Sequence, residues 1–136
     1  MKELIQQKIG TIMIIDDNNI DRYISSRLII KNDFANKLLE YATAVDALQY
    51  LQDNQHDIHS LPNIIFVDIY MPIMSGFEFM EAFNTLPQSL KTYCKVFIIS
   101  STIDDSDISR VHSDSNVFGF QEKPITKEFL EKITNT

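Results

Sequence analysis

Three short apolar runs stand out along the chain, at residues 12–15, 64–67 and 96–99. Uninterrupted runs of this length are typical of parallel strands whose two faces are both covered by helices. Two weaker runs, at residues 37–41 and 117–120, contain fewer apolar side chains and fit strands at the edges of a sheet. The pattern therefore predicts five strands, with the three most apolar ones in the centre.

Apolar residues between these runs recur at intervals of three and four, which is the spacing of one face of a helix. Five such series predict five helices. Thr43, with Asp46 three residues later, and Thr126 are placed to cap the second and the last helix. Asp104 and Asp105 lead into the fourth. The series are, in chain order, Ile20, Tyr23, Ile24 and Leu28; Ala44, Ala47, Leu48 and Leu51; Phe79, Met80 and Phe83; Ile108 and Val111; and Phe129, Leu130 and Ile133.

Strands and helices alternate in this prediction, and the alternation indicates an α/β fold with a parallel sheet and right-handed crossovers. A length of 136 residues fits one domain, which we expect to span residues 1–136 with a core from about residue 10 to residue 135. Ligands of doubly wound sheets bind beyond the carboxyl ends of the strands. The residues that directly follow each apolar run are therefore the candidates for chemistry.

An excess of acidic residues limits the partners of the chain. Nineteen Asp and Glu against 12 Lys and Arg give a formal net charge of −7, and no basic cluster offers a site for nucleic acid. The single cysteine, Cys94, cannot form an internal disulfide and is interpreted as a partly buried, reduced thiol. No apolar stretch reaches the roughly 18 residues that cross a membrane, and the N-terminus lacks the apolar core of a signal peptide. We expect a cytoplasmic protein.

Polar residues follow the central strands at their carboxyl ends. Asp16 and Asp17 follow the first predicted strand, and Asp68 follows the third. Ser100 follows the fourth strand, and Lys123 lies just beyond the fifth. Acidic residues at strand ends often cap the next helix, and this remains an alternative for Asp16 and Asp17. It fits Asp68 less well, because the residues after Asp68 do not begin a helix.

Three carboxylates in one cleft do not all remain ionised unaided, because like charges a few Å apart raise one another's pKa. A hard divalent cation such as Mg²⁺ would neutralise them, since it prefers oxygen ligands and needs few from the protein. Lys123 adds a positive charge at the same edge, and Ser100 adds a hydroxyl. A carboxylate surrounded by a cation, an ammonium and a hydroxyl is organised to accept a phosphoryl group as an acyl phosphate.

The strand-end residues belong to a longer ordered set, which comprises Asp16 and Asp17, Asp68 followed by Met71, Pro72 and Gly76, Ser100, Phe120, and Lys123 followed by Pro124. Together they resemble the receiver domain of two-component response regulators, over nearly the whole chain. Each feature is weak alone, but their occurrence in order at the ends of the right strands is specific. The resemblance implies a flavodoxin-like doubly wound sheet of five parallel strands in the order 2-1-3-4-5, with helices on both faces.

The resemblance assigns Asp68 as the phosphoacceptor and implies Mg²⁺ as the cofactor. Asp17 would bind the cation directly, and Asp16 would bind it directly or through a water. Asp68 itself and the backbone carbonyl of Tyr70 would complete the protein's share of the ligands.

The resemblance also implies the residues that respond to the phosphoryl group. Ser100 would donate a hydrogen bond to one phosphoryl oxygen, and Lys123 would pair with another. Ser100 and Phe120 would form the switch, with Phe in place of the commoner Tyr at the aromatic position. Gly76 would provide a positive φ or close packing where the chain turns into the third helix, and a cis bond would join Lys123 to Pro124.

The implied function is signalling. A histidine kinase or a histidine phosphotransfer protein would donate its phosphoryl group to Asp68, and the face of the fourth helix, fifth strand and fifth helix would change its affinity for a downstream protein target. No direct contact with nucleic acid or a membrane is expected. The chain would not be an enzyme beyond its own phosphorylation and a slow self-dephosphorylation. The self-dephosphorylation would be slow because Tyr70, which flanks the phosphoryl site together with Thr102, would shield that site from water. Since the chain ends near the end of the fifth helix, we expect a stand-alone receiver or a fragment of a longer protein.

Two alternatives stay open. A phosphohydrolase with an aspartate nucleophile needs a second Asp two residues after the first, but Asp16 is followed by Asp17, Asn18 and Asn19. A pseudo-receiver that keeps only the fold and acts as an interaction module usually loses the acidic pair, the acceptor or the lysine, and all of these are present here. Both alternatives are therefore less favoured than the receiver.

Overall fold

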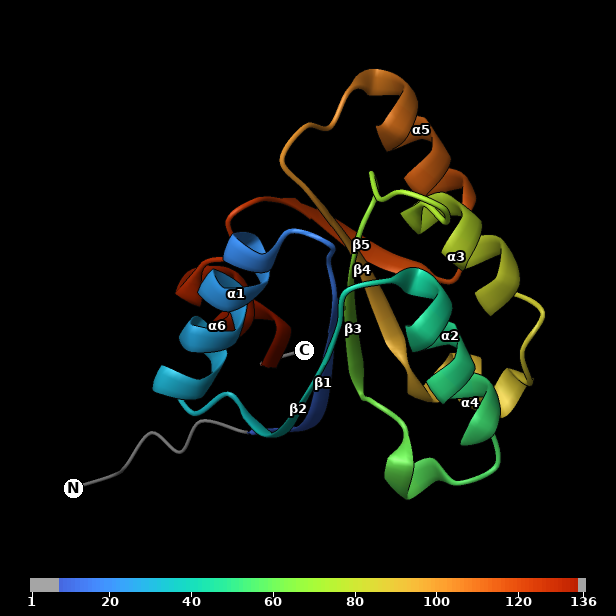
Figure 1. Cartoon of the computed structure of the whole chain (residues 1–136), viewed down its shortest axis with the longest axis horizontal. Helices are drawn as coiled ribbons and strands as arrows, with labels where there is room; N and C mark the ends of the chain where they lie inside the picture. The colour runs from blue at the N-terminus through green and yellow to red at the C-terminus, as the bar shows by residue number, and fades with distance from the viewer. Residues whose placement is uncertain (1–7, 135–136) are drawn as a thin grey trace.

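Five parallel strands form a single sheet in the order β2-β1-β3-β4-β5 in the computed structural model, which describes residues 8–134 (Figure 1). This is the order that the resemblance implied, and the three most apolar runs are the three central strands. The two weaker runs form the edges, as expected. The strands are β1 (Ile9–Ile15), β2 (Ala35–Tyr41), β3 (Ile64–Asp68), β4 (Lys95–Ser100) and β5 (Val117–Glu122).

Helices cover both faces of this sheet. Figure 1 shows α1 and α6 on one side and α2, α3, α4 and α5 on the other. Among residues 8–134, no helix is both long enough and apolar enough to cross a membrane. The helices are α1 (Asn19–Lys31), α2 (Ala44–Asp53), α3 (Gly76–Phe83), α4 (Gln88–Tyr93), α5 (Asp105–Ser113) and α6 (Lys127–Thr134), and a short 3-10 helix spans Ile58–Ser60.

The helix α4 has no counterpart among the five predicted helices, so the fourth and fifth predicted helices are α5 and α6. It contains only six residues, and Leu90 is the one that it buries. Six residues make fewer than two helical turns, which is too short for a helical pattern to repeat, so the sequence pattern did not indicate this element.

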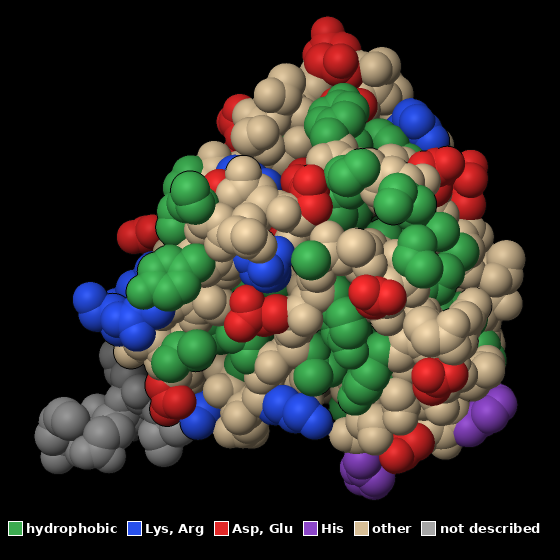
Figure 2. Space-filling view, in the orientation of Figure 1, with side chains coloured by type: hydrophobic (Ala, Val, Ile, Leu, Met, Phe, Trp, Pro, Cys, Tyr) green, Lys and Arg blue, Asp and Glu red, His purple; other side chains and the backbone are tan. Residues whose placement is uncertain are grey.

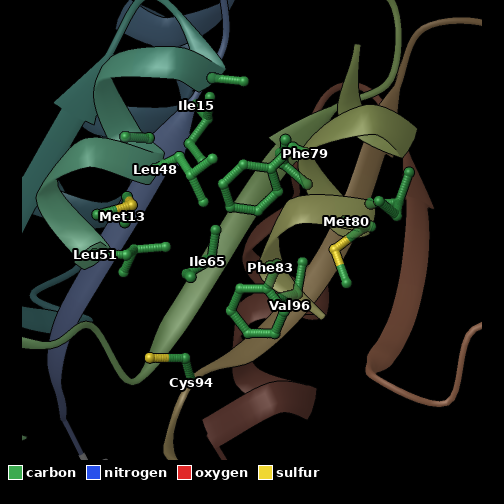
Figure 3. Close-up of a cluster of buried hydrophobic side chains, with 14 of the residues drawn as sticks. Met13, Ile15, Leu48, Leu51, Ile65, Phe79, Met80, Phe83, Cys94 and Val96 are labelled. Atoms are coloured by element: carbon green, nitrogen blue, oxygen red, sulfur yellow. The ribbon is translucent and has the colours of Figure 1, made fainter. Parts of the chain in front are cut away.

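The side chains of the central strands divide the core into two clusters. Met13 and Ile15 of β1 point into the cluster beneath α2 and α3, which Figure 3 shows, whereas Ile12 and Ile14 belong to the cluster beneath α1 and α6. Neighbouring residues of a strand point to opposite faces, so an uninterrupted apolar run is buried on both. Cys94 lies in the first cluster, and burial raises the pKa of its thiol to about 12, in agreement with a reduced, unreactive side chain.

The helix α1 forms where its apolar series predicts it, but the series does not mark its buried face. Ile20, Tyr23 and Ile24 are 71%, 62% and 45% exposed, whereas Ser26 and Ile29 are the residues that α1 buries. Figure 2 shows the hydrophobic side chains over α1 at the left of the view. The helix is apolar on more than one side, and the pattern alone does not tell which side meets the sheet.

The predicted caps position the helices as expected. The Thr43 hydroxyl accepts a hydrogen bond from the Asp46 backbone N–H at 3.1 Å, and the Thr126 hydroxyl accepts one from the Phe129 N–H at 3.1 Å. Asp104 caps α5. Such contacts satisfy backbone donors that have no partner inside the helix, and they fix where each helix begins above the sheet.

Candidate functional site

The carboxyl ends of β1, β3, β4 and β5 bring the predicted strand-end residues into one cleft. Asp16 follows β1, Asp68 and Ser100 end β3 and β4, and Lys123 follows β5. Because the strands are parallel and adjacent, these four positions lie along one edge of the sheet. The cleft is lined by Asp17, Asn18, Asn19, Ile20, Asp21, Asp68, Tyr70, Ser100, Ser101 and Lys123.

Three carboxylates meet at this edge of the sheet. Asp16, Asp17 and Asp68 each offer an oxygen, and these oxygens lie within 4.8 Å of one another. Asp16 and Asp68 are buried, whereas Asp17 is exposed to solvent. A set of carboxylate oxygens at this spacing fits a hard divalent cation such as Mg²⁺, which takes oxygen ligands and retains several waters.

The environment of Asp68 makes ionisation of its carboxyl less favourable than in water. Burial is the main cause that raises the pKa of this carboxyl above its usual range, and the nearby charge of Asp16 raises it further. The ammonium of Lys123 opposes both effects. A buried acid beside another acid is under electrostatic strain that a bound cation would relieve.

The Lys123 ammonium joins three carboxylates. Its Nζ lies 2.8 Å from an oxygen of Asp16, 2.8 Å from an oxygen of Asp21 and 3.2 Å from an oxygen of Asp68. Burial by itself would lower the pKa of Lys123, but the hydrogen bonds to Asp16 and Asp21 outweigh it and raise the pKa above the ordinary value. Lys123 therefore carries a permanent positive charge next to Asp68. The bond from Lys123 to Pro124 is cis.

Asp21 is a residue of the cleft that the sequence analysis did not find. It lies in the first turn of α1, and its backbone N–H donates to the side chain of Asn18, the N-cap, at 2.9 Å. Because α1 begins directly above the end of β1, its first turn faces the cleft. The strand-end rule considers only residues next to a strand and therefore passes over Asp21.

Comparison with known proteins places this chain in a family. A family model described as the response regulator receiver domain matches residues 12–135. The chain belongs to the receiver domain family. Members of this family are generally signalling domains of two-component systems.

The relatives of this receiver domain share about a quarter of its residues. A probable methanogenesis regulatory protein, FilR2, from Methanothrix harundinacea is 26% identical over 121 residues, which cover 89% of this chain and 76% of that protein. A two-component response regulator from Cytophaga hutchinsonii is 25% identical and superimposes with a TM-score of 0.87, covering 95% of this chain and 96% of its own. A response regulator receiver protein from Dyadobacter fermentans is 26% identical with a TM-score of 0.82, over 91% of this chain and 94% of its own.

The hydroxyl of Ser100 is engaged within its own loop. Ser100 is buried, and its Oγ lies 3.0 Å from the carbonyl oxygen of Thr102, to which it donates, and 3.4 Å from the Thr102 N–H, from which it accepts. Ser101 also lines the cleft but is exposed. In this receiver, a new acceptor in the cleft would compete with Thr102 for the Ser100 proton.

Tyr70, which lines the receiver's cleft, links the β3–α3 loop to α5. Its hydroxyl donates to a carboxylate oxygen of Asp107 at 2.6 Å, although 55% of the Tyr70 side chain is exposed. This hydrogen bond raises the pKa of Tyr70 to about 12. Asp107 is buried in the first turn of α5, where it also completes a capping box with Asp104. This contact could not be anticipated from the local pattern, because its partners are 37 positions apart in the chain.

Phe120 lies on β5 and does not line the receiver's cleft. Its half-buried ring packs against the larger core cluster, and the centre of the ring is 6.0 Å from that of His112 on α5. The side chain therefore occupies the junction of β5 and α5. His112 itself is exposed to solvent.

Gly76 permits a close approach of backbone segments behind Asp68. A Cβ at position 76 would lie 2.4 Å from the carbonyl oxygen of Asp68. The Gly76 N–H donates to the carbonyl oxygen of Ile69 at 2.7 Å, and its φ is not positive. Of the two reasons expected for this glycine, close packing is the one that the structure contains.

Proposed function

We propose that this receiver domain accepts a phosphoryl group on Asp68 from the phosphohistidine of a histidine kinase or a histidine phosphotransfer protein, with Mg²⁺ as cofactor. The observation that carries the proposal is the position of the Asp68 carboxylate, next to two further acids and 3.2 Å from the Lys123 ammonium. An acid with a purely structural role does not require two neighbouring carboxylates and an ammonium. The expected output is a change of the α5–β5–α6 face toward a downstream protein.

The proposed reaction transfers phosphorus from nitrogen to oxygen. An oxygen of the Asp68 carboxylate attacks the phosphorus atom of the phosphohistidine, the P–N bond breaks, and its electron pair stays on the imidazole nitrogen. Lys123 holds one phosphoryl oxygen by its ammonium, and Ser100 holds another by its hydroxyl. Asp16, Asp17, Asp68 and the Tyr70 carbonyl would hold Mg²⁺, which supplies positive charge to the transferring oxygens.

The proposed switch begins at the Ser100 hydroxyl. Phosphoryl oxygens are stronger acceptors than the carbonyl of Thr102, so the β4–α5 loop would follow Ser100 toward the cleft. Phe120, which lies next to His112 of α5, would then repack at the junction of β5 and α5. In this way a local charge would alter the α5–β5–α6 face.

The exposed apolar residues of α1 support a protein as the phosphoryl donor. Ile20 lines the cleft itself, and Tyr23 and Ile24 continue the apolar surface along α1. A contiguous apolar surface at the rim of a reactive site is typical of a protein contact. Phosphorylation by a partner would therefore be faster than by a small donor that makes no such contact.

Incubation with acetyl phosphate and Mg²⁺, followed by intact mass measurement, tests the proposal. We expect the chain to gain about 80 Da, the mass of one phosphoryl group, and Asp68→Asn to gain nothing. Addition of a chelator before acetyl phosphate should also abolish the gain. An unchanged mass of the wild-type chain would instead support the pseudo-receiver, and steady turnover of a phosphomonoester would support the phosphohydrolase.

Tyr70 is expected to slow the loss of the phosphoryl group by shielding it from water. Tyr70 lines the cleft, and its hydroxyl is held by Asp107. Tyr70→Asn should therefore shorten the half-life of the phosphorylated chain by about tenfold, as water gains access to the acyl phosphate. The half-life is measured by the decay of the added mass after removal of acetyl phosphate.

Tyr70→Phe is the matched control for this prediction. It keeps the ring and removes only the hydroxyl that contacts Asp107, so its half-life should lie between those of the wild type and Tyr70→Asn. Equal half-lives in all three proteins would contradict the shielding role.

A further inference from the structure

Asp21 occupies a position in the cleft that the phosphoryl chemistry described above does not use. An ammonium has three N–H donors, and Lys123 has three carboxylate neighbours, one of which is Asp21. Asp16 and Asp21 both lie 2.8 Å from Nζ, whereas Asp68 lies at 3.2 Å. The ammonium is therefore held more closely by Asp21 than by the proposed phosphoacceptor.

We propose that Asp21 is a positioning residue that draws the Lys123 ammonium toward α1 and thereby slows phosphorylation of Asp68 by anionic donors. The inference rests on the proposed function and deepens it, because it assigns a brake on the reaction to a named side chain. Asp21 touches Lys123 and not Asp68, so it acts through the lysine.

Competition for the ammonium is the first reason. For Lys123 to bind a phosphoryl oxygen, one of its three N–H donors must leave a carboxylate. Asp21 is 35% exposed and retains its position through the first turn of α1, so its hold on the lysine persists as a donor enters the cleft. An N–H group of Lys123 that is bonded to Asp21 cannot at the same time donate to an oxygen of the transferring phosphoryl group.

Charge at the mouth of the cleft is the second reason. Asp21 lines the cleft together with Asp17 and Asp68. With Asp16, the site holds four carboxylates. The positive charges beside them are the Lys123 ammonium and the Arg22 guanidinium, which donates to the carbonyl oxygen of Asp16 at 2.6 Å, so the acids remain in excess. A surplus of negative charge lowers the local concentration of an anionic phosphoryl donor and raises that of a cation.

These reasons predict opposite effects of Asp21→Asn on the two ligands. At saturating Mg²⁺, the rate constant for phosphorylation by acetyl phosphate should rise about fivefold, since Lys123 is released and the repulsion falls. The affinity for Mg²⁺ should fall about fivefold, since one negative charge is lost from the cleft. A loss of packing alone would not raise the rate.

Asp46→Asn is the matched control. Asp46 occupies the same place in the first turn of α2 as Asp21 does in α1, three residues after the capping side chain, and it does not line the cleft. The Asp46→Asn substitution therefore removes the same charge from the same kind of helix position as Asp21→Asn does. We therefore expect its phosphorylation rate and Mg²⁺ affinity to equal those of the wild type.

Calorimetric titration with Mg²⁺ and the growth of the phosphorylated mass together decide the inference. A faster reaction and a weaker cation site in Asp21→Asn, with neither change in Asp46→Asn, support it. If Asp21→Asn is phosphorylated no faster than the wild type, the inference is overturned while the proposed function stands. If the wild type is not phosphorylated at all, the proposed function fails. In that case an Asp21→Asn protein that binds Mg²⁺ as tightly as the wild type would also overturn the positioning role of Asp21.

Discussion

Asp17→Asn is expected to lower the affinity of the receiver for Mg²⁺ by at least about 100-fold, and the rate of phosphorylation with it. Asp16 and Asp68 are buried and pair with Lys123, so part of their charge is already neutralised. Asp17 is exposed and takes no part in those ion pairs. It is the carboxylate that is most available to a cation from solvent.

Isothermal titration calorimetry with Mg²⁺ measures this effect, and the acetyl phosphate assay at a fixed Mg²⁺ concentration measures its consequence. Asp33→Asn provides the control, because it removes an acid that pairs with Lys8 and lies outside the cleft. An Asp17→Asn protein that binds Mg²⁺ as the wild type does would show that the acidic cluster is not the cation site.

Gly76→Ala is expected to lower the free energy of unfolding by about 3 kcal/mol. The added Cβ would lie 2.4 Å from the carbonyl oxygen of Asp68 and 3.0 Å from the Cα of Ile69. Both neighbours are backbone atoms, so relief requires a shift of the β3–α3 loop rather than a change of rotamer. The same shift would displace the proposed phosphoacceptor.

Urea denaturation of Gly76→Ala and Gly119→Ala separates this effect from the general cost of replacing glycine. A Cβ at position 119 would lie 3.3 Å from the ring of Phe97, a side chain rather than backbone, and a shift of a few tenths of an ångström relieves the contact. We expect Gly119→Ala to change the free energy of unfolding by about 1 kcal/mol or less. Equal destabilisation of the two variants would contradict the special role of Gly76.

The sheet could be predicted from the sequence because a strand that is buried on both faces appears as an uninterrupted run of apolar residues. A run such as residues 64–67 has no polar face, and all five residues of β3 are buried in the structure. The features that could not be predicted from the sequence lack such a run. The six residues of α4 bury a single leucine, and α1 carries apolar side chains on more than one side. In those places tertiary packing, and not the local pattern, decides the structure.

The cleft could be anticipated in outline for a topological reason. Parallel strands deliver their carboxyl ends to one edge, so Asp16, Asp68 and Lys123 had to lie near one another once the strand order was right. The contacts of Asp21 and Asp107 followed from no such rule. Each depends on how far a helix turn reaches over the sheet edge, and the partners are distant in sequence: Asp21 and Lys123 are 102 positions apart.

The most direct measurement of the central claim is the chemical identification of the residue that carries the phosphoryl group. Borohydride reduces an aspartyl phosphate to homoserine, which peptide mass spectrometry locates in the sequence. After treatment with acetyl phosphate and Mg²⁺, we predict homoserine at position 68 and at no other aspartate. Homoserine elsewhere, or a phosphorylated peptide that resists borohydride, would contradict the account.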